Sequence, residues 1–166
     1  VIDYKDIMLR GRHNYENICT CLTAIIDLID IDKAVEIFKT FKGVEHRLEF
    51  VREINGIKWY NDSVSSTPTR TIAGLNSYEE NIVLIAGGYD KNIPYEPLGP
   101  IINKKVKLLV LLGDTAPKIE KAVKEAENYN ANEIDIVNVD NMEQAVLAVV
   151  ERAKEGDIVS LSPASA

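Results

Sequence analysis

The chain has 166 residues, enough for one ordinary α/β domain and a small appendage; 46% of them are hydrophobic, which excludes disordered and fibrous proteins. Its formal net charge of −7, without a cluster of Lys or Arg, disfavours nucleic acid or an anionic membrane as a partner. No apolar run approaches the roughly 20 residues that cross a bilayer, and no signal peptide is recognisable. We expect a cytoplasmic protein that acts as a monomer.

Residues 14–43 predict two helices. The first carries one apolar stripe at helical spacing, made by Ile18, Leu22, Ile25, Ile26 and Ile29. Asp32 is expected to cap the second helix and Gly43 to end it. Two helices this small cannot bury their own apolar stripes well. We therefore expect them to pack on another part of this chain or of the longer protein. Cys19 and Cys21 point to different faces of the first helix, which excludes a disulfide between them and predicts buried or half-buried thiols.

From Arg47 onward the hydrophobic period changes from helical to extended. Asn55-Gly56 is a strong turn signal between two short strands and predicts a β-hairpin. A polar loop rich in Ser and Thr follows, and Pro68 fits the first turn of a helix that reaches about Leu75.

The remainder of the chain alternates between short apolar strands and amphipathic helices. The predicted strands cover residues 82–86, 106–112, 134–139 and 158–161. Two helices between them are indicated by the apolar faces Ala116, Ile119, Ala122, Val123 and Ala126, and Met142, Ala145, Val146 and Val149. This pattern predicts an α/β fold, a Rossmann-like and mostly parallel sheet with helices on both faces. The strand order cannot be read from the pattern.

A domain boundary is expected at residues 43–46, where the helical period gives way to the strands. We therefore divide the chain into a helix pair at 1–44 and a sheet domain at 45–166. The chain begins at Val1 and stops at Ala166, directly after an apolar strand. We expect it to be a piece of a longer protein, with the sheet domain truncated at its C-terminal end.

Polar residues gather where the predicted strands end, which is where open α/β sheets bind ligands. Residues 61–67 place four hydroxyl side chains before a helix, which suits an anion, unless Thr67 only caps the helix and the others form turns. Gly87-Gly88 follows an apolar strand and precedes Lys91, which is either a ligand-binding cation or an exposed lysine on a loop.

Two further groups could contact a nucleotide. Arg47, next to His46, could hold phosphate oxygens, although a surface arginine beside a hinge is the alternative. Asn14 and Asn17 could read a base edge or cap their helix. No Walker loop, Ser-His-Asp set or metal-ligand spacing is present, so we name no catalytic and no metal-ligating residue.

Four of these segments, in this order, resemble the motifs of the Mur ligases. They are residues 11–17 (GRHNYEN), 41–49 (FKGVEHRLE), 87–91 (GGYDK) and 156–164 (GDIVSLSPA). One such motif is weak evidence, but four in register are specific, and together they cover essentially the whole chain. The resemblance implies that residues 1–44 are the tail of a central ATP-binding domain and that 45–166 belong to the C-terminal domain.

Within the family, residues 60–63 (YNDS) are similar to the members that add D-glutamate. Two departures follow: Val64 stands where Lys is common, and Ser65-Ser66-Thr67 replaces Ala-Thr-Asn, which keeps a hydroxyl at Ser66. A sister ligase, a folylpolyglutamate synthase and a non-catalytic nucleotide-binding domain remain alternatives.

The resemblance also implies roles for single residues. Asn14 and Asn17 would contact the adenine of ATP, Arg47 its phosphates and Asp62 its ribose, with His46 nearby. Lys91 and Ser66 would hold the carboxylates of D-glutamate. The other implied partners are UDP-N-acetylmuramoyl-L-alanine and Mg²⁺, whose ligands would lie upstream of this chain.

Overall fold

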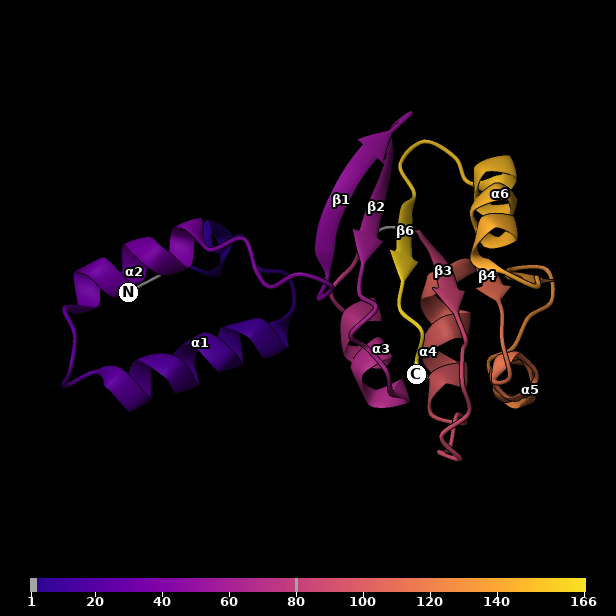
Figure 1. Cartoon of the computed structure of the whole chain (residues 1–166), viewed down its shortest axis with the longest axis horizontal. Coiled ribbons are helices and arrows are strands. Elements are labelled where there is room, and N and C mark those ends of the chain that lie inside the picture. The colour runs from indigo at the N-terminus through magenta and orange to yellow at the C-terminus, as the bar shows by residue number, and fades with distance from the viewer. Residues whose placement is uncertain (1–2, 80) are drawn as a thin grey trace. The chain divides into compact units, whose positions relative to one another are not determined.

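The computed structural model describes residues 3–79 and 81–166 (Figure 1). They form two compact units, one ending at Val44 and one spanning Glu45–Ala166. The elements of the first unit are a 3₁₀ turn, η1 (Tyr4–Asp6), and the helices α1 (Arg12–Ile25) and α2 (Ile31–Thr40). Those of the second unit are β1 (Glu49–Ile54), β2 (Ile57–Asn61), α3 (Pro68–Leu75), β3 (Ile82–Ala86), α4 (Leu98–Lys105), β4 (Val106–Leu111), α5 (Ala116–Glu125), β5 (Asp135–Asn138), α6 (Met142–Arg152) and β6 (Ile158–Leu161).

The two predicted helices of the first unit are present, but three details differ from the sequence analysis. Asp30, not Asp32, caps α2, because the Asp30 carboxylate accepts a hydrogen bond from the Asp32 N–H. The helix ends at Thr40, before Gly43. Cys19 and Cys21 are free and exposed, so the predicted burial of their thiols is wrong.

Burial in the first unit is sparse. The hydrophobic residues buried in its helices are Ile18 in α1 and Ala34 in α2, whereas Leu28 is 79% and Ile37 is 63% exposed. A pair of helices this short offers too little surface to cover both apolar stripes, which agrees with the expectation from the sequence. No helix in the described part of the chain is long and apolar enough to span a bilayer.

The second unit is built on a six-stranded sheet with the order β1-β2-β6-β3-β4-β5 (Figure 1). β1 is antiparallel to β2, and the other neighbouring strands are parallel. The Asn55-Gly56 turn joins β1 to β2 with φ angles of 53° and 72°, both positive as a type I′ hairpin requires. The predicted mostly parallel sheet is confirmed, and β6, the last strand among the described residues in chain order, lies in its interior.

Both faces of the sheet are covered, as predicted. Residues of β3 alternate between two cores: Leu84 belongs to the core that also contains residues of α3, α4 and α5, while Val83 and Ile85 pack with Ala145 and Val149 of α6. From β2 the chain proceeds through β3 and β4 to the edge strand β5, and the connecting helices α3, α4 and α5 cover one face of the sheet. The chain then returns to the interior of the sheet through α6 on the opposite face.

The sequence analysis missed α4. Gly99 and Pro100 in its first turn look like helix breakers, yet a proline there forfeits no intrahelical hydrogen bond because the first N–H groups of a helix have no partner. A Cβ atom on Gly99 would lie 2.2 Å from the Ala122 carbonyl oxygen of α5. The glycine therefore permits the close approach of α4 and α5.

Gly87 follows β3 in a backbone conformation that residues with a side chain rarely adopt. Its φ is +111°, and a Cβ atom would lie 2.0 Å from the Leu112 carbonyl oxygen, whereas Gly156 has φ +89° with nothing within 4 Å. We expect Gly87→Ala to lower the free energy of unfolding by roughly 2–5 kcal/mol, since backbone strain and a steric clash add, and Gly156→Ala by roughly 1–2 kcal/mol from strain alone. Urea denaturation of both variants measures this difference. Equal losses would show that the close packing of Gly87 on Leu112 contributes nothing.

Candidate functional site

Three polar segments of the second unit meet at one edge of the sheet. β2, β6 and β3 are parallel, so the loops that follow Asn61, Leu161 and Ala86 leave the sheet at its carboxyl edge. β1 runs the other way, and its first residue, Glu49, pairs with Asn61. The segment around His46 and Arg47 therefore enters at this same edge, beside the polar loop after β2.

Asp62, directly after β2, is the buried centre of this edge, with 1% of its surface exposed. Its Oδ1 accepts a hydrogen bond from the Leu48 N–H at 3.1 Å, and its Oδ2 accepts one from the Ser162 hydroxyl at 2.8 Å. The Ser162 Oγ also lies 3.1 Å from the Thr71 Oγ1 of α3. Gly74 leaves room for the carboxylate, because a Cβ there would lie 2.9 Å from Asp62 Oδ2.

Burial raises the pKa of Asp62 above its ordinary value of 3.8. Hydrogen bonds from Ser65, Ser162 and Leu48, together with the positive charge of Arg47, act in the opposite direction but do not cancel the loss of hydration. The carboxylate thus interacts with the Arg47 charge from a buried position.

His46 and Arg47 are exposed on the loop that Asp62 holds. His46 and Leu48 both have positive φ, 65° and 48°, so Arg47 stands between two residues in the left-handed conformation. The Asn61 Nδ2 lies 2.9 Å from the His46 Nδ1, and the His46 N–H donates to the Glu49 carboxylate at 2.8 Å. These contacts fix the backbone on both sides of Arg47 and leave its guanidinium at the surface.

Lys91 and Ser66, predicted to bind the same carboxylates, come together in the structure. The Lys91 Nζ lies 3.5 Å from the Ser66 carbonyl oxygen, although 25 residues separate them. Ser66 is half-buried and Lys91 is exposed. Thr67 occupies the N-cap position of α3, but its hydroxyl makes no capping hydrogen bond. The alternative in which the Thr67 side chain only caps the helix is therefore wrong.

The loop that carries Lys91 is held by backbone hydrogen bonds, by a bond to a threonine hydroxyl and by an ion pair. The Gly87 N–H donates to the Pro163 carbonyl oxygen at 2.9 Å, and the Tyr89 N–H to that of Ala166 at 2.7 Å. The Gly88 N–H donates to the hydroxyl of Thr115, and Asp90 forms an ion pair with Lys118.

Sequence reasoning missed Ser162, Ser165, Thr115 and Lys118 as parts of this edge. Ser162 lies inside a motif that was recognised, while Thr115 had only the signal of a hydroxyl residue before a predicted helix. The partners of the Thr115, Lys118 and Ser162 side chains are 27 to 100 residues away in the chain, so local patterns do not reveal them.

Asn14 and Asn17 lie on α1, in the first unit. Asn14 is buried, and its Nδ2 donates to the Arg10 carbonyl oxygen at 2.7 Å, an interaction that orders the start of the helix. Asn17 is exposed. Among residues 3–79 and 81–166, no group of three or more His, Cys, Asp or Glu side chains is placed to hold a metal ion.

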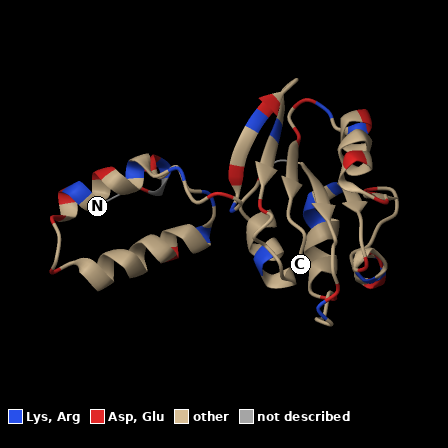
Figure 2. Ribbon diagram, in the orientation of Figure 1, with Lys and Arg blue, Asp and Glu red and all other residues tan. Residues whose placement is uncertain are grey.

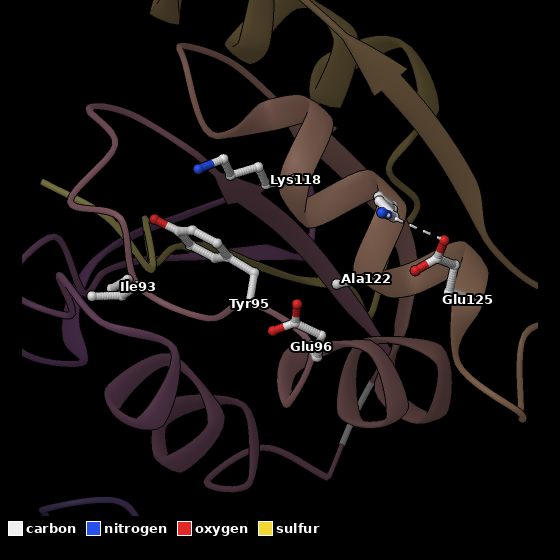
Figure 3. A pocket seen from close by; sticks show the side chains of 7 residues that line it. Ile93, Tyr95, Glu96, Lys118, Ala122 and Glu125 are labelled. Atoms are coloured by element: carbon white, nitrogen blue, oxygen red, sulfur yellow. Dashed lines mark ion pairs between the residues drawn. The ribbon is translucent and has the colours of Figure 1, made fainter.

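A cavity of about 270 Å³ opens beside α5 (Figure 3). Its lining consists of Ile93, Tyr95, Glu96, Lys118, Lys121, Ala122 and Glu125. Lys118 pairs with Asp90, and Lys121 lies 3.8 Å from Glu125. Because both lysines already face carboxylates, the cavity does not offer the concentrated positive charge that a phosphate or a dicarboxylate needs.

The chain is similar in sequence to proteins of one known family. A match to the family described as Mur ligase, glutamate ligase domain, covers residues 46–165. The chain is 53% identical over 164 residues to the UDP-N-acetylmuramoylalanine–D-glutamate ligase of Acetivibrio thermocellus, covering 98% of this chain and 35% of that protein. It is 49% identical over 166 residues to the enzyme of the same name from Clostridium botulinum strain Hall, covering 100% of this chain and 36% of the relative. The chain thus spans about a third of the length of these relatives.

Solved structures support the fold. Mycobacterium tuberculosis folylpolyglutamate synthase complexed with ADP superimposes with a TM-score of 0.68 at 14% identity, covering 96% of this chain and 39% of that one. MurF ligase from Thermotoga maritima, in complex with ADP, gives a TM-score of 0.66 at 18% identity, covering 91% of this chain and 34% of that one. At these identities the likeness concerns the fold alone.

The raised pKa of Asp62 predicts a pH dependence of stability. Because the folded state binds the proton more tightly than the unfolded chain, this stabilisation is fully present below the ordinary pKa of 3.8 and is lost as the pH rises through the raised value. The free energy of unfolding of the wild type, relative to that of Asp62→Asn, should therefore fall as the pH rises from about 4 and then level off. Urea denaturation of both proteins at a series of pH values measures it. A difference that grows with pH would contradict the raised pKa.

Proposed function

This chain belongs to the Mur ligase family, as its motifs predicted, and we propose that it is the C-terminal part of an ATP-dependent ligase that adds D-glutamate to UDP-N-acetylmuramoyl-L-alanine in peptidoglycan precursor synthesis. The two relatives at 49–53% identity carry the name of that enzyme. Because the chain spans about a third of their length, the activity belongs to the longer protein.

The proposed chemistry follows from the reactivity of a carboxylate, which is a poor electrophile. Transfer of the γ-phosphoryl group of ATP to the carboxylate of the precursor gives an acyl phosphate and ADP. The amine of D-glutamate then attacks the acyl carbon, the C–O bond to phosphate breaks, and the amide, inorganic phosphate and a proton are released. Several anionic groups must meet in this reaction, so cationic side chains are needed to offset their repulsion.

The contact between Lys91 and Ser66 is the observation that carries the assignment of the amino-acid site. It puts an exposed ammonium group beside a serine-rich loop that leads into the N-terminus of α3, where backbone N–H groups and the helix dipole favour an anion. D-glutamate offers two carboxylates to such a site. We infer that Lys91 forms an ion pair with one of them and that the Ser66 hydroxyl donates a hydrogen bond.

We infer roles in nucleotide binding for residues of each unit, each unit taken by itself. Arg47, exposed between two left-handed residues, would contact the phosphates, with His46 nearby, and Asn14 and Asn17 would contact adenine. Asp62 was expected at the ribose; its burial and its bond to the Leu48 N–H favour a role in holding the Arg47 loop beside that site. The resemblance implies that the ligands of Mg²⁺ lie upstream of this chain, where the ion would offset the charge of the ATP phosphates.

The surface charge fits small-molecule partners. Lys and Arg are interspersed with Asp and Glu along the ribbon (Figure 2), and the net charge is −7. Such a surface disfavours the phosphate backbone of a nucleic acid. The charge thus supports our proposal of an enzyme without a nucleic-acid or membrane partner, and from the resemblance we further propose that it is cytoplasmic and acts as a monomer.

Replacing Lys91 tests the amino-acid site. In the full-length ligase, Lys91→Ala should raise the KM for D-glutamate by roughly 10- to 150-fold, the effect of losing a charge-assisted contact, and leave the KM for ATP nearly unchanged. Arg47→Ala should instead impair the ATP-dependent step. Steady-state kinetics with each substrate varied in turn measures both effects.

Lys104→Ala, which removes an exposed lysine of α4, is the matched control and should change neither constant. If Lys91→Ala leaves saturation by D-glutamate untouched, the assignment of this loop is wrong. Efficient use of a different amino acid by the wild type would favour a sister Mur ligase or a folylpolyglutamate synthase instead.

The 166-residue chain by itself should not carry out the reaction, because it has no phosphate-cradling Gly-rich loop of the Walker type in its sequence. We expect no phosphate release that depends on D-glutamate when the purified chain is incubated with ATP, Mg²⁺ and the precursor, at concentrations where the full-length enzyme turns over. Such release would show that the division of roles between the domains is wrong.

A further inference from the structure

We propose that Thr115 is a positioning residue for the amino-acid site: its buried hydroxyl fixes the Gly88 backbone and thereby the position of Lys91. This inference rests on the function proposed above, in which Lys91 binds a carboxylate of D-glutamate. It concerns a residue that touches neither substrate.

Thr115 and Gly88 are joined by two backbone-directed hydrogen bonds. The Gly88 N–H donates to the Thr115 Oγ1 at 3.0 Å, and the Thr115 N–H donates to the Gly88 carbonyl oxygen at 3.1 Å. Thr115 is fully buried. Its hydroxyl hydrogen can go to the Gly88 carbonyl oxygen at 3.3 Å or to the Ser165 Oγ at 3.4 Å.

The position of Thr115 in the fold separates this role from ordinary helix capping. It occupies the N-cap position of α5, where a threonine hydroxyl usually accepts from an N–H of its own helix. Here the hydroxyl makes no such bond. It accepts instead from Gly88, 27 residues earlier, so the interaction organises the loop after β3 and not the start of α5.

The first turn of α5 supplies a second anchor to the same loop. Lys118 forms an ion pair with Asp90, whose carboxylate also accepts from the Asn92 N–H at 2.9 Å. The hydrogen bond from Lys118 lowers the pKa of Asp90, which keeps this carboxylate charged but paired. Both sequence neighbours of Lys91, Asp90 and Asn92, thus take part in these interactions. The negative charge of Asp90 is partly neutralised by Lys118 before an anionic substrate binds.

The loop after β3 and the loop before α5 approach each other closely at Gly88. A Cβ atom on Gly113 would lie 2.9 Å from the Gly88 Cα, and one on Gly88 would lie 2.4 Å from the Ala166 carbonyl oxygen. Loss of the Thr115 hydroxyl would leave the partly buried Gly88 N–H without its acceptor. The loop would then gain mobility around Gly88, and the Lys91 ammonium would spend less time beside Ser66.

The test is kinetic and uses the full-length ligase. Thr115→Ala should raise the KM for D-glutamate by roughly 3- to 30-fold, with the KM for ATP unchanged, and Thr115→Ser should restore the wild-type value because it keeps the hydroxyl. Hydrogen exchange of the 87–91 segment should be faster in Thr115→Ala than in the wild type. Lys121→Ala, on the same helix and paired with Glu125, is the matched control and should change none of these quantities.

Lys91→Ala in the same series separates the two proposals. A large effect of Lys91→Ala with a Thr115→Ala enzyme whose KM for D-glutamate stays within twofold of the wild type would overturn the role of Thr115 and leave the proposed function intact. No effect of Lys91→Ala would overturn the proposed function and this inference with it. If Thr115→Ala does not fold, Thr115→Val decides, because it keeps the shape of the side chain and removes the hydroxyl that accepts from Gly88: it should raise the KM for D-glutamate selectively, whereas an unchanged KM would refute the positioning role.

Discussion

A buried carboxylate at the end of β2 organises the candidate site. Water is the usual partner of an ionised carboxylate, and a folded protein that removes this water must supply other donors. Asp62 receives them from the residue after Arg47, from the segment after β6 and from its own loop. A hydrogen bond to a charged group typically contributes about 1.5–3 kcal/mol, so this arrangement resists local rearrangement. The exposed Arg47 consequently stands on a rigid support.

The segment that follows β6 connects the two halves of the site. Ser162 donates to Asp62 on the Arg47 side, and the Pro163 and Ala166 carbonyl oxygens accept from the loop that carries Lys91. Between these contacts, the Ala164 N–H donates to the Ser65 carbonyl oxygen, next to Ser66. A single short stretch of chain therefore contacts the loops after β2 and β3, which carry Ser66 and Lys91, and is linked to the Arg47 loop through Asp62. The central position of β6 is what makes this possible, since its neighbours on both sides are the strands that lead into those loops.

The sequence was informative wherever local chemistry decides structure. Asn55-Gly56 specified the hairpin, Pro68 the start of α3, and the continuous apolar run 82–86 a strand buried on both faces. It was uninformative where distant residues decide. The place of β6 depends on pairing with strands far away in sequence, and α4 depends on the close approach that Gly99 allows to α5. The motifs identified Asp62 and Lys91 as polar residues of interest, but whether a side chain turns inward or outward depends on what the rest of the fold places around it.

The interior position of the last strand also has a consequence for biosynthesis. Asp62 and its partner Ser162 are 100 positions apart, and β6 inserts between β2 and β3. At a translation rate of about 5–20 residues per second, roughly 5–20 s pass between the synthesis of the two residues. During this time β2 and β3 are made but their shared neighbour is not, and each exposes unpaired backbone groups of the kind that promote strand addition by other chains. The nascent domain is thus vulnerable to aggregation until β6 has left the ribosome, and the sheet cannot close before that point.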